Sequence, residues 1–211
     1  MTAKYYSALE ETINIASHGL GCVLGVAALV ALLLVAWPAD NWLLTASFGM
    51  FGVSLIATYG ASTIYHSVKE PVLRGRLRVV DHASIYLLIA GTYTPLTLIT
   101  LHGPLGWTIF AACWGMALVG IALKLVFTGR YSRLSTLMYV FMGWMIVFAI
   151  SPLIDTLPAV GLRWLVAGGV LYTVGAVLYG IKQIPFNHAL FHIFTLLGSV
   201  SHFMAIYGYV R

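Results

Sequence analysis

The chain has 211 residues, of which 61% are hydrophobic and only 8% are charged. A soluble domain carries about 25% charged residues, so this composition excludes a soluble globular protein and predicts an integral membrane protein. A net charge of +5 is compatible with nucleic-acid binding. The basic residues mark membrane topology instead, however, and we expect no nucleic-acid partner.

Seven apolar runs of about 20 residues, the length that crosses a bilayer as a helix, follow one another along the chain. They fall near residues 18–37, 42–66, 79–101, 106–127, 134–152, 160–181 and 188–209. The breaks between them hold turn-forming or polar residues and leave no room for a soluble domain. The sequence therefore predicts an all-α fold, in which residues 1–211 form a single seven-helix transmembrane domain with antiparallel neighbours.

The first apolar run, residues 19–37, is long enough to span the bilayer as a retained helix. Glu10 and Glu11 precede it in place of the short basic region of a signal peptide, and the run has no clear small-residue cleavage site. Gly21 and Gly25 have the G-x-x-x-G spacing that lets helices approach closely, which we interpret as packing within the bundle.

Residues 1–17 are interpreted as a partly interfacial lead-in to the first helix. Helical periodicity puts Glu11, Asn14 or Ile15, and His18 on roughly one face of this segment. Glu11 and His18 either contact the ligand side chains of a site and orient them, or they cap and orient the helix. We favour the second interpretation.

The distribution of the eleven lysines and arginines predicts the orientation of the bundle. With the N-terminus inside, only Arg163 and Arg211 lie on the outer side, and this bias predicts an N-in, C-out topology. The cytoplasmic side holds the other nine: Lys4, Lys69, Arg74, Arg76, Arg78, Lys124, Arg130, Arg133 and Lys182. An aromatic belt is expected at the outer ends, formed by Trp37, Trp42, Trp107 and Trp164. Pro95 lies within the third span and predicts a kink there.

Several polar residues gather at the predicted inner ends of the helices, although they come from distant parts of the chain. They are His18, Ser62, His66, Asp81, His82, His188 and His192. With a rise of about 1.5 Å per residue, all of them lie within roughly two turns of one membrane boundary. Ionisable residues inside a membrane span mark a functional site by default.

His188 and His192 are four residues apart, so their side chains share one helix face and suit a single metal ion. Such a pair is equally compatible with structural pairing or hydrogen bonding at the helix end. His66 arrives at the same depth from another helix, and three neutral imidazoles with one open position are typical of a catalytic zinc site. We therefore predict a metal site formed by these three histidines.

Asp81 has two interpretations. It is either a helix N-terminal charge favoured by the dipole, with Arg76 or Arg78 as ion-pair partner, or a base that holds and deprotonates a water beside the metal. Ser62 either donates a hydrogen bond to an oxyanion or bonds back to a helix carbonyl, and both interpretations remain open.

The remaining histidines are expected to lie outside the metal site. His202 follows His192 by ten residues, about 15 Å along a helix, so we expect it to bond to a neighbouring helix. His82 points about 100° away from Asp81 around the helix and is a poorer ligand than His66. His102 falls in a predicted outer loop and is expected to be solvated.

The stretches ETINIASHGLG, ASTIYHSV, DHASIYLLIAGTYTP and FNHALFHIFTLLGSVSHF, in this order, resemble the hemolysin III branch of the progestin and adipoQ receptor family. The resemblance implies a seven-helix bundle with zinc near the inner face. It implies His66, His188 and His192 as zinc ligands, Asp81 as the holder of the zinc-bound water and Ser62 as part of the site lining. The long polar N-terminal domain of the eukaryotic receptors is not seen, so hormone reception is not expected.

These observations favour a zinc-dependent intramembrane hydrolase of ceramide-like lipid amides at the inner leaflet, with a role in membrane lipid homeostasis. One alternative is a non-enzymatic sensor or regulator of membrane lipids with a structural zinc, and another is a cytolytic protein of the hemolysin III type. Membrane lipids are the expected partners, and the expected location is the plasma membrane, which in bacteria is the inner membrane. Assembly into homo-oligomers is left open.

Overall fold

The computed structural model describes residues 5–127 and 132–211, with only the backbone described for residues 132 and 133. Within this part of the chain all the regular structure is helical, and seven helices are long and apolar enough to cross a membrane. The all-α, seven-span prediction is confirmed. The single-domain assignment and the N-in orientation stay predictions.

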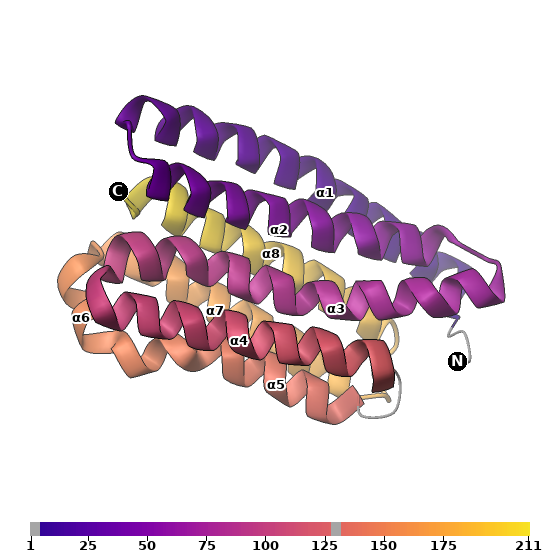
Figure 1. The fold of residues 1–211 in the computed structure, drawn as a ribbon. Helices are drawn as coiled ribbons and strands as arrows, with labels where there is room; N and C mark the ends of the chain where they lie inside the picture. Colours follow the sequence, from indigo (N-terminus) through magenta and orange to yellow (C-terminus); the bar gives the residue numbers. More distant parts are fainter. Residues whose placement is uncertain (1–4, 128–131) are drawn as a thin grey trace.

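The helices form one bundle in which the two termini lie at opposite ends (Figure 1). The helix α1 packs along α2, α2 packs along α3, and α8 packs against both α7 and α1. The elements in chain order are α1 (Ala8–Ala36), η1 (Trp37–Ala39), α2 (Trp42–Ser67), α3 (Pro71–Pro95), η2 (Leu96–Leu101), α4 (Gly103–Phe127), α5 (Ser132–Trp144), η3 (Met145–Ala149), α6 (Ile150–Thr156), α7 (Ala159–Gly180) and α8 (Asn187–Tyr209).

Two helices begin more than two turns before the predicted spans. The first starts at Ala8, where the Ser7 hydroxyl caps it by accepting a hydrogen bond from the Glu10 amide at 3.2 Å. The lead-in from residue 8 onward is therefore the beginning of α1 and not a separate segment. The third helix starts at Pro71, because the Glu70 carboxylate accepts hydrogen bonds from the first free amides of α3.

Two spans contain breaks in the regular α-helix. At Pro95 the α-helix α3 passes into the π-helical turns of η2. The kink predicted at this proline stays a prediction. The fifth span is interrupted by the 3-10 segment η3. There the Tyr93 hydroxyl donates to the Gly143 carbonyl at 3.0 Å and accepts from the Ile146 amide at 2.8 Å, which satisfies backbone groups that the break leaves unbonded.

Small residues and buried hydroxyls hold the helices at the distances the site requires. A Cβ atom added to Gly21 would lie 2.6 Å from the Tyr59 ring, so this glycine packs within the bundle as predicted. The hydroxyls of Tyr59 on α2 and Tyr172 on α7 both lie 2.6 Å from the Ser199 hydroxyl on α8. These bonds join three helices midway along the bundle and set the position of α8.

The predicted aromatic belt lies at the helix ends away from the N-terminus. Its tryptophans are at least one-third exposed, as expected for side chains that contact lipid headgroups: Trp37, Trp42, Trp107 and Trp164. Among the basic residues assigned to the opposite end, Lys4 and Arg130 lie outside the described residues, as does the side chain of Arg133.

Candidate metal centre

Three histidines from two helices meet at the end of the bundle that also holds the N-terminus. His66 lies in the last turn of α2, while His188 and His192 lie in the first two turns of α8. All three are less than 5% exposed, and one ligand nitrogen from each lies within 4.8 Å of the others. The Nε2 atoms of His66 and His188 are 3.1 Å apart. The structure thus brings together the three predicted ligands in a group that can hold a metal ion.

The start of α8 is tied to the end of α7, which fixes the height of the histidine pair. The Asn187 side-chain amide donates hydrogen bonds to the Tyr179 carbonyl at 2.9 Å and to the Ile181 carbonyl at 3.2 Å. Phe186 precedes the helix with a φ of 56° and turns the chain sharply into it. With this entry fixed, the i, i+4 spacing leaves the two imidazole centroids 4.4 Å apart on one face.

The Glu11 carboxylate binds the back of the His66 ring. Its Oε2 atom lies 2.6 Å from Nδ1 of His66, and its Oε1 atom pairs with the Arg74 guanidinium. A hydrogen bond from Nδ1–H to this carboxylate leaves the Nε2 lone pair of His66 facing the other histidines, as in a carboxylate–histidine–metal arrangement. The expectation that Glu11 serves mainly to cap the helix was therefore wrong, although its Oε1 also accepts from the Tyr6 amide at 3.3 Å.

Arg74 holds this carboxylate in place and is itself only 1% exposed. Its guanidinium also donates to the Tyr65, His66 and Val68 carbonyls, the last at 2.9 Å, and so caps the end of α2. One buried cation thus satisfies both a helix C-terminus and the carboxylate that orients a ligand. Sequence reasoning counted Arg74 only as a marker of topology.

Aromatic rings cover two of the candidate ligands. His18 stacks on His192 with a centroid distance of 3.6 Å and an interplanar angle of 6°, and neither of its ring nitrogens makes a hydrogen bond of good geometry within the described residues. Tyr6 stacks on His188 at 4.5 Å, and burial raises the pKa of Tyr6 above its ordinary value, so it stays neutral. These contacts restrict rotation of the ligand rings. His18, too, was expected to orient the helix and instead contacts the site directly.

Asp81 and Ser62 lie beside the three histidines. Asp81 is 7% exposed and lines the cavity that His188 and His192 also line. It is ten residues into α3, so the helix-dipole interpretation is wrong because that effect fades within the first turn. Nε2 of the neighbouring His82 lies 3.9 Å from Oδ2 of Asp81, a contact that is an ion pair only when the imidazole is protonated. The Ser62 hydroxyl faces this carboxyl without the geometry of a full hydrogen bond and makes no bond to a helix carbonyl.

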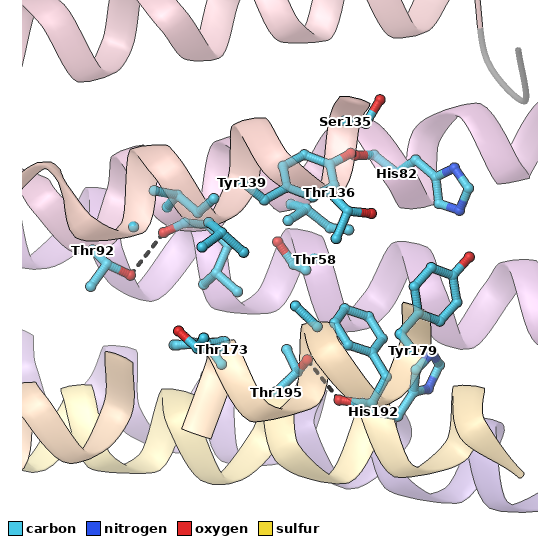
Figure 2. A pocket seen from close by; sticks show the side chains of 18 of the residues that line it. Thr58, His82, Thr92, Ser135, Thr136, Tyr139, Thr173, Tyr179, His192 and Thr195 are labelled. Carbon is cyan, nitrogen blue, oxygen red and sulfur yellow. Dashed lines mark hydrogen bonds between the residues drawn. The ribbon is translucent and has the colours of Figure 1, made fainter. Parts of the chain in front are cut away.

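A cavity of about 140 Å³ extends from the histidines into the bundle, and we call it the site cavity. Its walls come mainly from α3, α5, α7 and α8. Figure 2 shows the polar side chains of His82, Thr136, Tyr179 and His192 around one end, and Thr92 and Thr173 farther along. Between and beyond them the lining is mostly apolar or aromatic, so the cavity is suited to an amphiphile whose polar group lies near the histidines.

Comparison with known proteins decides the family. Residues 6–203 match the family model described as haemolysin-III related. The chain belongs to the haemolysin-III-related family. This confirms the family suggested by the sequence motifs.

The haemolysin-III-related sequence resembles both bacterial and mammalian proteins. It is 43% identical to Hemolysin-3 of Bacillus cereus over 210 residues, which cover 100% of this chain and 96% of that protein. It is 42% identical to the Hemolysin-3 homolog of Bacillus subtilis (strain 168), covering 95% of this chain and 94% of that protein. The human monocyte to macrophage differentiation factor is 28% identical over 169 residues, with 76% and 69% of the two chains covered. No solved structure matches the chain.

The donor set of this haemolysin-III-related protein fits a tetrahedral metal such as zinc. Zinc–nitrogen bonds of 2.0–2.1 Å put two imidazole nitrogens about 3.3 Å apart, close to the 3.1 Å between Nε2 of His66 and Nε2 of His188. A distance of 3.1 Å also fits a hydrogen bond between the two imidazoles. Measuring the metal content of the protein distinguishes a metal-bound pair from a hydrogen-bonded pair. The carboxylate on Nδ1 of His66 is the partner expected for a ligand histidine.

His202 lies outside the histidine group, as predicted. Its Nε2–H donates to the Leu165 carbonyl on α7 at 3.1 Å, and its ring packs against Gly168 and Tyr172. It also lines the site cavity, which extends that far along α8. His102 is exposed at the turn before α4.

Proposed function

We propose that the protein is a zinc-dependent intramembrane hydrolase of lipid amides that acts in membrane lipid homeostasis. The observation that carries the proposal is a group of three buried imidazoles at one end of a mostly apolar cavity, which His188, His192 and the Asp81 carboxyl line. A polar headgroup with its amide would reach these groups, while an acyl chain would lie along the apolar walls.

His66, His188 and His192 would hold the metal, and Glu11 would keep the His66 ring in the orientation and tautomer that ligation needs. When bound, zinc supplies Lewis-acid polarisation of the amide carbonyl and lowers the pKa of water to about 7. The stacked rings of His18 and Tyr6 would keep bulk water away from the ligand side chains.

The remaining chemistry falls to Asp81 and Ser62. Asp81 would accept a proton from the attacking water, whose oxygen forms a bond to the amide carbon. The same carboxyl would then return the proton to the leaving nitrogen as the carbon–nitrogen bond breaks. The products are a fatty acid and an amine. Ser62 lies beside this carboxyl and would orient it or donate a hydrogen bond to the oxyanion.

Replacing Asp81 with Asn is expected to lower the rate of fatty acid release from a ceramide-like amide by about 100-fold or more, because general acid–base catalysis contributes at least this factor. The metal content of the variant should stay at the wild-type level, since Asp81 is not one of the three grouped ligands. The measurement is fatty acid release in liposomes, with the exposed Asp155→Asn as the matched control. Equal rates for Asp81→Asn and wild type would refute the role of this carboxyl.

A structural metal in a lipid sensor or regulator is the second candidate. It is favoured because the three histidines lie on two different helices, so a metal ion bound to them would join α2 to α8 directly. In that case His188→Ala would lower the melting temperature, and no lipid amide would be hydrolysed. A cytolytic role comes only from the names of the Bacillus relatives and would be revived by dye release from liposomes that contain the protein.

A further inference from the structure

Lys124 is a cation that lines the site cavity and that the proposed chemistry does not use. It lies three residues before the end of α4, is only 6% exposed, and is the one charged residue of that helix. A lysine that only marks topology extends its ammonium group to the headgroup region, as the exposed Lys69 does. Lys124 points inward instead, so topology alone does not explain its position.

The surroundings of Lys124 are rich in hydrogen-bond donors and positive charge. Its Nζ lies 5.9 Å from the centroid of the Tyr139 ring, and the Arg78 guanidinium is close enough to repel it. The side chains of His82, Ser135 and Thr136 line the same cavity and lie around its polar end in Figure 2. This end therefore offers cationic and neutral donors from three helices.

The charges around the cavity favour an anionic ligand. Asp81 is the acidic residue among the described lining residues, and Lys124 lines the same cavity. The Arg78 guanidinium adds a second positive charge near Lys124. Burying an ammonium group is costly unless a negative charge compensates it. An anion placed beside Lys124 would gain from the weak screening of a site inside a bilayer.

We propose that Lys124 forms a subsite for the anionic headgroup of the substrate, so that the lipid amides bound here carry a carboxylate or a phosphate close to the amide group. This inference rests on the proposed function, because it assigns the polar part of the amide substrate to a place in the same cavity. An N-acyl amino acid and an N-acyl aminoalkyl phosphate both have this chemistry. A neutral amide of equal chain length would lack the ion pair and bind more weakly.

The test is binding of a ligand that cannot be hydrolysed. In 4-oxopentadecanoic acid a methylene replaces the nitrogen of N-dodecanoylglycine, and its methyl ester is the neutral counterpart. We expect wild-type protein in phosphatidylcholine nanodiscs to bind the acid at least tenfold more tightly than the ester. Lys124→Met should remove this preference, whereas Lys124→Arg and the control Lys69→Met should keep it. An alkyl phosphate of the same length, compared with its neutral dimethyl ester, tests the second anion.

The subsite would be overturned if wild type bound the acid and its methyl ester with equal affinity, and likewise the alkyl phosphate and its dimethyl ester. This outcome would count even if Lys124→Met fails to fold. If Lys124→Met weakened binding of the acid and of the ester by the same factor, the subsite would also be overturned. Such a result indicates a damaged cavity and not a lost ion pair. Since no turnover is measured, the outcome is independent of whether the protein hydrolyses amides. Failure of the proposed hydrolysis would instead appear as absent fatty acid release while the preference for the anion persists.

Discussion

His192→Ala is expected to remove the bound metal from the protein. Wild type should carry one zinc per chain, and the variant should retain less than about one-tenth of that after dialysis. Loss of an orienting partner alone costs 10–100-fold in metal affinity, and loss of a ligand should cost more. His192 is 1% exposed and belongs to the grouped ligands, so the variant loses one of the three ligand nitrogens. The measurement is metal content by elemental analysis of purified protein.

His202→Ala is the matched control for this prediction. It removes the same side chain from the same helix and from the wall of the same cavity, but its imidazole bonds to the Leu165 carbonyl and not to the histidine group. Its zinc content should equal that of wild type. If both variants lose zinc to the same extent, or if neither does, the metal is not held by the three predicted ligands.

Glu11→Gln is expected to weaken zinc binding by about 10–100-fold while leaving the three ligands in place. The substitution removes the negative charge that accepts the Nδ1 hydrogen of His66 and that pairs with Arg74. The buried guanidinium then loses its counter-charge, which should also lower the melting temperature. Competition with a zinc chelator and thermal unfolding in detergent measure the two effects.

Glu10→Gln is the control, because Glu10 belongs to the same first turn of α1 and its substitution changes the net charge equally. It should bind zinc like wild type. If Glu11→Gln lowered only the melting temperature and left the zinc affinity unchanged, Glu11 would be a structural ion-pair partner and not a residue that orients a ligand.

The number of helices was predictable because the bilayer sets their length. The helix boundaries were less predictable, because apolar composition indicates where lipid contacts a helix and not where the helix begins. The early starts at Ala8 and Pro71 depend on caps by Ser7 and Glu70. The 3-10 segment within the fifth span is bridged by Tyr93. Gly143 lies two residues before it, but an isolated glycine in an apolar helix is tolerated and does not by itself predict a break.

The histidine group was predictable from spacing and depth. The i, i+4 pair sets one helix face, and the topology brings the end of α2 to the same height. The contact of Glu11 with His66 joins residues 55 positions apart and depends on how α1 is rotated against α2. Sequence periodicity put Glu11 and His18 on one face but left open which neighbour that face contacts. The burial of Lys124 was not predicted either, because periodicity does not show which face of α4 contacts the other helices.

Zinc titration of metal-stripped protein in liposomes, with release of fatty acid from a defined lipid amide as the readout, determines whether the metal is catalytic. We expect no release without metal, a rate that rises in proportion to added zinc, and a plateau at one zinc per chain. Release that is equal at every zinc concentration, or absent at all of them while one zinc binds, would contradict a catalytic metal centre at His66, His188 and His192.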